Sequence, residues 1–358
     1  MRTVVAYEVG RPLVLEDLPV PEVGPRDVLV RVTASGICHT DLTVIQGLSP
    51  LPLPIVPGHE GCGIVEEVGS EVRRVRVGDR VLASVSPACG HCWWCINGMS
   101  NHCELNPGVK AKKRFTLADG REAAAVCGCG TFAEAMVVDE ASVVAVQTEL
   151  PDEQLALLGC GVTTGLGAAL NTAEVTPGSS VAVIGCGGVG QSVIQGARIA
   201  GAATIIAVDT MANRRAAAVA AGATHTVDPA EGDAVQQVRA LTSGRGADFT
   251  FEVVGRPELI TQSIDMARTS GTVTLVGMPA ATDVLTLPAI STIFSGKRIR
   301  GSVVGGSQIL RDFPRYIRLV EAGRLDLGSM ITHRIKLDEI NQGFDLLIRG
   351  EGVRTVVV

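Results

Sequence analysis

Four closely spaced cysteines form the densest group of metal-ligating residues in the sequence. They follow the pattern C-x2-C-x2-C-x7-C and are Cys89, Cys92, Cys95 and Cys103. Cysteines of a large intracellular chain stay reduced, so this spacing indicates a metal site before it indicates disulfides. Four thiolates that leave no open position suit a tetrahedral structural zinc ion, although an iron–sulfur cluster can use a similar spacing. We therefore expect a structural zinc site here, with His91 and His102 outside the ligand shell.

A second set of candidate ligands is dispersed along the chain, as is usual in catalytic metal sites. Cys38 and His59 each follow an apolar stretch that predicts a strand, and Cys160 lies between two glycines much later. Taken singly, each residue also has a structural explanation: a small buried thiol, a loop histidine, or a cysteine packed at a glycine turn. Their assignment to one site needs support from the rest of the sequence.

A glycine-rich turn in the middle of the chain supplies that support. The apolar run 180–184 predicts a buried parallel strand, and a G-x-G-x-x-G motif follows at once with Gly185, Gly187, Gly188 and Gly190. A helix is expected at 191–200, and the strand expected at 203–208 ends on Asp209, 24 residues after Gly185. This order offers a helix N-terminus to a pyrophosphate and an acid to ribose hydroxyls. The carboxylate favours NAD over NADP.

The alternation of strands and helices continues beyond this motif. Further strands are expected at 225–227, 248–254 and 272–276, and Pro257 suits the first turn of a helix between them. These βα units predict a doubly wound dinucleotide-binding domain. Residues 1 to about 155 carry short valine-rich runs broken by glycine and proline, which predict a β-rich domain.

Length, composition and charge agree with this organisation. The chain has 358 residues, of which 46% are hydrophobic and 19% charged, as is typical of a globular protein of two domains. A net charge of −6 provides no basic field for nucleic acid. Glu8 precedes any long apolar run, so no secretory signal is expected and the cytoplasm is the default location. The uncharged stretch 175–197 is long enough to cross a bilayer, but Pro177 and six glycines make it a poor span.

At these intervals the motifs resemble those of the zinc-dependent medium-chain alcohol dehydrogenases over essentially the whole chain. The resemblance rests on 36–41, Gly58-His59-Glu60, the four-cysteine loop, 158–165, the glycine turn with Asp209, and 352–355. It implies an α/β protein in which a doubly wound Rossmann NAD-binding domain interrupts a GroES-like, β-rich catalytic domain. The Rossmann domain would span 162–302, the catalytic domain 1–161 and 303–358, and the active site would lie in the cleft between them.

The resemblance also implies roles for individual residues at a catalytic zinc ion. Cys38, His59 and Cys160 would be its ligands, with water or substrate in the fourth position and Glu60 as an alternate ligand. Asp41 would orient His59, and Thr40 would take the proton of the zinc-bound alcohol. The alkoxide would then deliver a hydride to the nicotinamide, giving an aldehyde or a ketone. Several family members complete the proton relay with a histidine, and the matching position here is Thr43.

On the cofactor side, the resemblance implies that the four glycines approach the pyrophosphate and that Asp209 holds the adenosine ribose. Other residues expected near the dinucleotide are His39, Arg214, Val276, Met278 and Arg354. Each chain would use NAD and two zinc ions, one catalytic and one structural. The expected partners are a small alcohol or aldehyde and further copies of the chain, as a homodimer or homotetramer, with neither nucleic acid nor a membrane.

The sequence restricts the substrate less than it restricts the metal ions and the cofactor. The positions that resemble pocket residues hold Val85, Val126 and Cys127, whose small side chains leave room for aromatic or branched alcohols. The segment 105–126 carries the cations Lys110, Lys112, Lys113 and Arg114, which form either a solvated face or a site for the anionic part of a thiol adduct of formaldehyde. An alcohol dehydrogenase is therefore the first hypothesis and an S-(hydroxymethyl)thiol dehydrogenase the second. A non-catalytic binding protein is the third, and the presence of Cys38, His59 and Cys160 argues against it.

Overall fold

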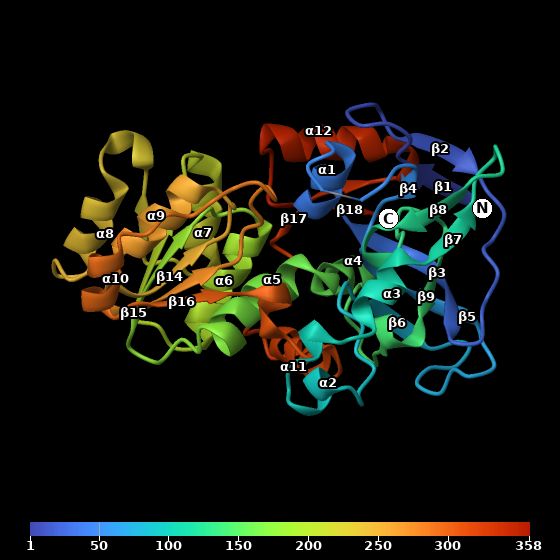
Figure 1. Ribbon diagram of the computed structural model, residues 1–358, viewed down its shortest axis with the longest axis horizontal. Helices are drawn as coiled ribbons and strands as arrows, with labels where there is room; N and C mark the ends of the chain where they lie inside the picture. The colour runs from blue at the N-terminus through green and yellow to red at the C-terminus, as the bar shows by residue number, and fades with distance from the viewer. Residues whose placement is uncertain (50) are drawn as a thin grey trace. The chain divides into compact units, whose positions relative to one another are not determined.

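Valine- and isoleucine-rich runs form the strands of two structural units in the computed structural model, which describes residues 1–49 and 51–358 (Figure 1). The first unit comprises Met1–Cys160, Gln308–Gly323 and Leu327–Val358. The second comprises Gly161–Ser307 and Arg324–Asp326. The chain therefore begins and ends in the same unit.

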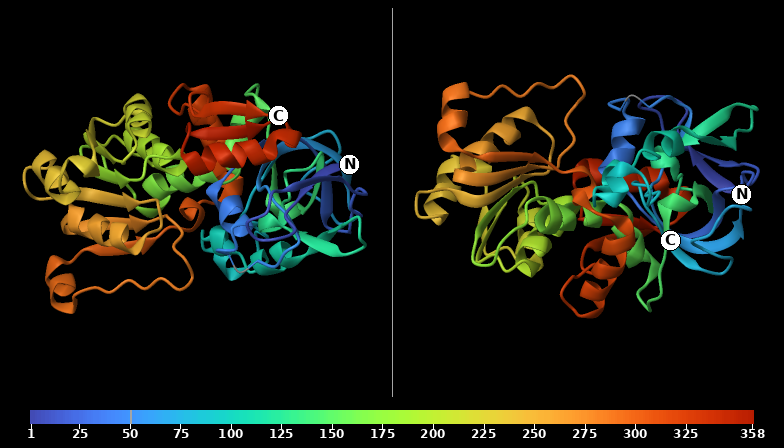
Figure 2. Two further views of the ribbon diagram at one scale, coloured as in Figure 1. Left: turned by 90° about the horizontal axis from the view of Figure 1, so that it is seen from above. Right: turned by 60° about the horizontal axis from the view of Figure 1, so that its bottom comes forward.

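A seven-stranded sheet is the largest element of the first unit. Its order is β10 (Val143–Ala145), β6 (Arg80–Ala83), β5 (Glu60–Val68), β3 (Asp27–Gly36), β18 (Arg354–Val357) and β17 (Ile331–Ile335), and β9 (Ala135–Asp139) also pairs with β3. Alternate side chains of β3, including Val28 and Val30, are buried in one core with Met136 of β9, because successive side chains of a strand face opposite sides. The carboxyl-terminal strands, red in Figure 2, thus belong to the same sheet as β3.

Smaller sheets and short helices complete this unit. One sheet pairs β1 (Arg2–Val5) with β2 (Val14–Asp17), and another has the order β4 (Ile55–Val56), β8 (Glu122–Ala125) and β7 (Lys113–Thr116). Its helices are α1 (His39–Ile45), α2 (Trp93–Ile96), α3 (Asn106–Ala111), α4 (Asp152–Ala156), α11 (Ile309–Glu321) and α12 (Ile340–Arg349).

Three strand ends of the large sheet meet at one place. Gly36, the last residue of β3, pairs with Glu60, the first residue of β5, and also with Val356 of β18. The residues just beyond these ends must therefore lie close together. They include Cys38 and His59, which are far apart in the sequence.

The second unit contains a six-stranded parallel sheet. Its order is β13 (His225–Val227), β12 (Thr204–Val208), β11 (Ser180–Ile184), β14 (Ala247–Glu252), β15 (Ala267–Leu275) and β16 (Arg298–Gly301). The chain moves outward from β11 to β13 and then returns to β14 on the other side of β11. In open parallel sheets, ligands bind at the carboxyl ends of the strands beside such a switch point.

Alternation along β11 sends hydrophobic side chains into two cores on opposite faces of this sheet. Val181 and Val183 are buried with residues of α6 (Gly188–Ile199) and α7 (Ala212–Ala221). Ala182 and Ile184 are buried with residues of α8 (Ala234–Leu241) and α9 (Pro257–Met266). A sheet covered on both faces requires the nearly continuous apolar run that the sequence shows here. The remaining helices of the unit are α5 (Gly161–Gly167), which continues into the π-helical stretch Ala168–Thr172, and α10 (Ala289–Ser295).

The expected elements of the second unit are present, and some of their ends differ from expectation. β11 and β13 have the expected bounds, and α9 begins at Pro257. α6 begins at Gly188, earlier than expected, because the glycine turn itself supplies the first helical residues. β14 ends at Glu252 because the carboxylate of that residue accepts the N–H groups of Val254 and Gly255 at 2.9 and 2.8 Å.

The uncharged stretch 175–197 forms a strand, the glycine turn and most of α6 rather than one long helix. In the part of the chain that the structure describes, no single helix is both long and apolar enough to cross a membrane. The helical stretches Asp152–Gly159 and Gly161–Thr172 reach that length only when joined across a break.

Candidate metal and cofactor sites

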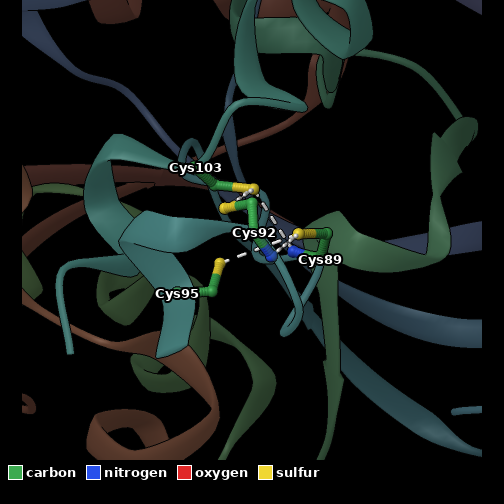
Figure 3. A group of neighbouring side chains, drawn as sticks. All are labelled: Cys89, Cys92, Cys95 and Cys103. Carbon is green, nitrogen blue, oxygen red and sulfur yellow. Dashed lines mark hydrogen bonds between the residues drawn. The ribbon is translucent and has the colours of Figure 1, made fainter. Parts of the chain in front are cut away.

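The four-cysteine loop brings its sulfur atoms together (Figure 3). The Sγ atoms of Cys89 and Cys95 lie 3.8 Å apart, and those of Cys92 and Cys103 lie 3.9 Å apart. A tetrahedral zinc ion with metal–sulfur bonds of about 2.3 Å has sulfur–sulfur edges of about 3.8 Å. All four cysteines are free thiols. The arrangement therefore fits a tetrahedral metal rather than disulfides.

Backbone groups of the loop point at these sulfurs. The N–H of Cys92 lies 3.3 Å from Cys89 Sγ, and the N–H of Cys89 lies 3.3 Å from Cys103 Sγ. A hydrogen bond from the backbone of Glu104 lowers the pKa of the Cys92 thiol to about 6, whereas burial raises the pKa of Cys95 to about 12. The loop thus favours a thiolate at Cys92 even before a metal is considered.

The two histidines near the loop lie outside the sulfur group, as expected. His91 Nδ1 lies 3.2 Å from the carbonyl oxygen of Cys89. The ring of His102 packs against Trp94, with 5.5 Å between ring centroids. Neither ring is needed to complete a four-sulfur ligand set.

A second group of candidate ligands meets in the first unit where the strand ends converge. Each of Cys38, His59, Glu60 and Cys160 offers a ligand atom within 4.8 Å of the others. Cys38 is the N-cap of α1, His59 directly precedes β5, and Cys160 follows the helical turn Leu157–Gly159. Gly159 permits this approach, since a Cβ atom on it would lie 2.9 Å from the carbonyl oxygen of Ala83.

His59 is buried and oriented by Asp41 of α1. His59 Nδ1 lies 3.0 Å from Asp41 Oδ1, which also accepts the Gly58 N–H at 2.8 Å. The other ring nitrogen, Nε2, is buried without a hydrogen-bond partner. A buried polar atom without a partner is costly, and a metal ion would satisfy it. One imidazole and two thiols are the ligand set of a catalytic zinc site with an open position.

The charges around this group favour the binding of a cation. A hydrogen bond from Cys160 lowers the pKa of Cys38 well below its ordinary value, and the same bond raises the pKa of Cys160. Burial opposes the protonation of His59, but the charges of Asp41 and Cys38 raise its pKa well above the ordinary value. A bound metal ion would take the place of the shared protons.

Glu60 forms a buried ion pair with Arg354, the first residue of β18. The Arg354 guanidinium also donates to the carbonyl oxygen of Ile37 at 3.2 Å. The structure thus places Arg354 beside the acidic member of the ligand group, where it joins β18 to the loop that carries Cys38.

Two threonines of α1 have different surroundings. Thr40 Oγ1 lies 3.8 Å from Cys38 Sγ. Thr43 Oγ1 donates to the carbonyl oxygen of His39 at 2.8 Å, one turn earlier in the helix. The Thr40 hydroxyl therefore lies at the ligand group, whereas the Thr43 hydroxyl is bound to the helix backbone.

The expected pocket residues lie in the first unit as well. Val85 and Val126 are buried, and Cys127 is partly buried with a positive φ of 54° in a short turn. Burial raises the pKa of Cys127, while the charges of His59 and Lys110 oppose this rise. Cys127 and Lys110 are therefore within electrostatic range of one another, and Cys127 is within range of the ligand group.

The basic segment has a role that the sequence did not suggest. Lys112 and Arg114 both form ion pairs with Asp27 of β3, the Arg114 pair at 3.0 Å. Asp27 and Arg114 are each only 2% exposed. Arg114 therefore connects β7 to β3 and is not free to bind a ligand. Lys112 lies just before β7 and pairs with the same carboxylate, although its side chain is 48% exposed.

The glycine turn lies at the carboxyl edge of the parallel sheet in the second unit. Gly187 is the N-cap of α6, and no side chain caps this helix. A Cβ atom on Gly185 would lie 2.6 Å from Val254 Cγ2, whereas one on Gly187 would meet nothing within 4 Å. The first N–H groups of a helix have no partner within the helix, so the open space above Gly187 suits a phosphate.

Asp209, at the end of β12, holds the glycine turn in place. Its Oδ2 accepts the Cys186 N–H at 2.7 Å, and its Oδ1 accepts the Met211 N–H at 2.8 Å. Each carboxylate oxygen keeps a second acceptor position for a ligand. The sequence suggested the acid as a ribose ligand but not as a brace for the turn.

The other residues expected near the dinucleotide are divided between the two units. Arg214 has a buried Nε without a partner. Arg215, which the sequence analysis did not single out, donates to the Asp209 carbonyl at 2.7 Å and pairs with Asp228 at 2.7 Å. Val276 and Met278 follow the end of β15, and Met278 is exposed. His39, in the first unit, is exposed at the start of α1.

Comparisons with known proteins find relatives over nearly the whole chain. Residues 24–148 match the model of the alcohol dehydrogenase GroES-like domain, and residues 188–322 match that of the zinc-binding dehydrogenase family. The chain is 37% identical over 366 residues to an S-(hydroxymethyl)glutathione dehydrogenase of Synechocystis, covering 99% of each chain. It is 36% identical over 376 residues to a class-3 alcohol dehydrogenase of Cereibacter sphaeroides, covering 100% of this chain and 99% of that one. The benzyl alcohol dehydrogenase of Acinetobacter calcoaceticus superposes with a TM-score of 0.93 at 32% identity, over 99% of this chain and 98% of that one.

Proposed function

Because the chain belongs to the zinc-dependent medium-chain alcohol dehydrogenases, a family of oxidoreductases, we propose that it oxidises primary and secondary alcohols, aromatic ones included, to aldehydes or ketones. NAD is the proposed hydride acceptor, and the reaction is reversible. The observation that carries this proposal is the group of Cys38, His59, Glu60 and Cys160 next to the Thr40 hydroxyl. The small side chains at Val85, Val126 and Cys127 and the similarity to a benzyl alcohol dehydrogenase support aromatic substrates.

Two zinc ions are assigned to the two groups of ligands. Cys38, His59 and Cys160 would hold the catalytic ion, with Glu60 in reach, and the four-cysteine loop would hold the structural ion. The catalytic ion supplies Lewis acidity, which lowers the pKa of a coordinated alcohol. The protein's part is to hold His59 in one ring orientation through Asp41 and to leave one coordination position open.

Thr40 is the residue proposed to accept the proton of the alcohol. Its hydroxyl lies 3.8 Å from Cys38 Sγ and can accept one proton while it donates another. Thr43 is a poor next carrier, since its hydroxyl is bonded to the His39 carbonyl. We therefore propose that Thr40 takes up the proton and releases it towards the side on which the nicotinamide ribose would lie, and that water rather than Thr43 carries it from there.

The dinucleotide is proposed to bind the domain 162–302, and residues 1–161 and 303–358 are proposed to form the catalytic domain. Gly185, Gly187, Gly188, Gly190 and the N-terminus of α6 would receive the pyrophosphate. The free acceptor positions of Asp209 would receive the ribose hydroxyls, and its charge would repel a 2′-phosphate. Further contacts to the dinucleotide are proposed for His39, Arg214, Val276, Met278 and Arg354.

A second substrate class is supported by one relative and one residue. That relative is named an S-(hydroxymethyl)glutathione dehydrogenase, and Lys110 lies within electrostatic range of Cys127. However, Lys112 and Arg114 are bound to Asp27, so the basic segment offers an anionic adduct less charge than its sequence suggests. Free alcohols therefore rank before thiol adducts of formaldehyde.

An assay of NADH absorbance with the zinc-loaded protein tests the proposal. The substrates are primary, secondary and aromatic alcohols, and formaldehyde with and without thiols, and zinc is quantified in parallel. We expect turnover on free alcohols and two zinc ions per chain. Turnover that requires formaldehyde and a thiol would select the second substrate class.

Two cysteine variants test the assigned site in the same assay. Cys38→Ser is expected to lose one zinc ion and all turnover. Cys62→Ser changes a buried thiol outside both ligand groups and is expected to keep both zinc ions and activity. Full activity of Cys38→Ser would contradict the site.

A homodimer or homotetramer is the proposed assembly. In the described chain, β16 is the last strand of its sheet and has no partner on its outer side. Nearby in sequence, α10 exposes Ile293 and Phe294 by 75% and 81%. An open strand edge with exposed apolar side chains is typical of a contact with a second copy. Light scattering of the wild type should give a mass that is a multiple of the chain mass. Phe294→Glu should reduce this mass, whereas Ile348→Glu, which changes an exposed residue of α12, should not.

The cytoplasm is the proposed location of the enzyme. The structure leaves all ten cysteines as free thiols, including both ligand groups. A reducing compartment keeps such thiols available for metal. Fractionation of cells that express the natural chain would test this location.

A further inference from the structure

A cavity lined by arginines lies in the first unit, beside the paired strands β6 and β10. Its volume is about 710 Å³, and its polar lining comprises Arg73, Arg74, Arg76, Asp79, Arg80 and Gln147. This volume falls within the range of about 300–1,000 Å³ that is typical of sites for small ligands. None of the proposed zinc ligands and none of the glycines of the dinucleotide turn line it.

The cavity carries an excess of positive charge. Four guanidinium groups line it against one carboxylate, Asp79, although the chain as a whole has a net charge of −6. Arg80 is neutralised by Asp152, and Arg76 lies 3.4 Å from Asp79. Among the described residues, no carboxylate lies within ion-pair distance of the guanidinium groups of Arg73 or Arg74. Glu140 accepts the backbone N–H groups of these two residues, at 2.9 and 3.3 Å, and so leaves their guanidinium donors to other partners.

Neutral backbone groups hold these two guanidinium groups in place. Arg73 Nη1 donates to the carbonyl oxygens of Ser70 and Val72, both at 2.9 Å. Arg74 donates to the carbonyl oxygens of Ala88 and Cys89, both at 2.6 Å. Carbonyl oxygens orient a guanidinium without cancelling its charge, and each group keeps further N–H donors. The cavity is therefore arranged for an anion before the anion arrives.

We propose that this cavity binds a small multivalent oxyanion of the pyrophosphate class through Arg73, Arg74 and Arg76. Guanidinium groups match the geometry of phosphate oxygens and bind them by paired, charge-assisted hydrogen bonds. An anion with at least two charges fits best, because the guanidinium groups of Arg73 and Arg74 each lack a carboxylate partner in the described part of the chain and Arg76 is paired only with Asp79 there. A bound anion would contact Arg74, whose guanidinium also donates to the carbonyl oxygen of Cys89, the first cysteine of the four-cysteine loop.

Calorimetric titration of the zinc-loaded full-length protein with inorganic pyrophosphate tests this proposal. The glycine turn can also attract pyrophosphate, so the test compares two variants with the same change in charge. Arg73→Gln combined with Arg76→Gln removes two cations of the cavity. Arg11→Gln combined with Arg245→Gln removes two exposed cations elsewhere.

We expect the cavity pair to weaken pyrophosphate binding by about tenfold or more, because charge-assisted hydrogen bonds are lost. The control pair should bind like the wild type. Equal affinities in the two pairs, or no binding by the wild type at millimolar pyrophosphate, would overturn the proposal. Alcohol oxidation should be the same in both pairs, so this result is independent of the proposed activity.

The single variant Arg76→Gln tests the proposal even if the double variant does not fold. Arg76 is 86% exposed, and its ion pair is with Asp79, three residues away. Arg76→Gln should therefore fold and still weaken binding in the same direction. Arg76→Lys should restore part of the affinity, because it keeps the charge but loses the planar group of donors. Unchanged affinity in Arg76→Gln would contradict a role for this arginine.

Discussion

At the scale of single residues, two buried acids, Asp41 and Asp209, position the groups around the candidate metal and cofactor sites. Asp41 receives both the ring of His59 and the N–H of Gly58 on one carboxylate oxygen. Asp209 accepts the backbone N–H of Cys186, in the glycine turn after β11, and that of Met211, in the turn after β12. Replacing either acid should therefore remove a charge and also shift the groups that its carboxylate holds in place.

Asp41→Asn is expected to weaken metal binding by the Cys38 group about 10- to 100-fold, as is usual when a ligating histidine loses its carboxylate partner. Zinc content after dialysis against a graded series of chelators measures this change. Asp119→Asn, an exposed carboxylate paired with Arg121, is the matched control. Equal zinc retention by the two variants would show that His59 does not need Asp41.

Asp209→Ala is expected to narrow the preference for NAD over NADP. The carboxylate repels a 2′-phosphate, so its removal should lower kcat/KM with NAD and raise the relative value with NADP. Both kcat/KM values are measured on the same protein sample. If the weakened turn lowers the fraction of folded protein, it lowers both values equally and leaves their ratio unchanged. An unchanged ratio would mean that Asp209 only braces the turn.

The sequence predicted candidate metal ligands but not all of the residues that contact them. Cys38, His59 and Cys160 could be named because few side chains bind zinc and because known family motifs surround them. The pairing of Glu60 with Arg354 could not be inferred from spacing, since 294 residues separate the two. Such a contact depends on strand pairing between β3, β5 and β18, which local patterns do not specify.

At the scale of elements, the ion pairs of Asp27 join two sheets of the first unit. Burial alone would raise the pKa of Asp27, but the hydrogen bond from Lys112 and the charge of Arg114 lower it below the ordinary 3.8. A lowered pKa in the folded state means that the pairs stabilise the fold fully above pH 3.8. This contribution is lost as the pH falls through the lower value of the folded state.

Asp27→Asn is accordingly expected to reduce the free energy of unfolding by about 3–5 kcal/mol at pH 7, because it leaves the buried Arg114 without its anion. Urea unfolding of the variant and the wild type measures this difference. The difference should shrink as the pH falls below 3.8, where the wild type also loses the charge. A constant difference across that range would assign the effect to packing rather than to charge.

Elements were predictable where the local pattern alone decides their structure. β11 is a buried, mostly apolar strand that ends at a glycine turn, and Pro257 marks the start of α9. β15 begins at Ala267, five residues before the expected Thr272, through Arg268 and Thr269. Those polar residues join the strand because β14 and β15 pair at Ala247 and Ala267, a long-range contact with a register shift.

At the scale of the whole molecule, both candidate metal groups belong to the first unit and the glycine turn to the second. The second unit has its own buried cores around β11. The two units should therefore respond differently to removal of zinc.

Chelation is expected to loosen the first unit and leave the second nearly unchanged. Hydrogen exchange of the chelated and zinc-loaded protein measures this response. The amides of 89–103 should exchange faster after chelation, because the loop loses its proposed cross-link. The amides of β11, β12 and β14 should keep their protection, and equal acceleration in both units would contradict the assignment of both zinc sites to one unit.

The placement of the aromatic residues gives the four-cysteine loop its own optical signal. The chain contains two tryptophans, Trp93 and Trp94, and both lie in α2 between Cys92 and Cys95. Their indole rings are 4.9 Å apart at an angle of 87°. Intrinsic tryptophan fluorescence of the whole protein therefore originates in this one loop. Loading and loss of a metal in this loop should be visible in unlabelled protein as a change in emission. Events confined to the group around His59 should leave this emission unchanged, because neither tryptophan belongs to that group.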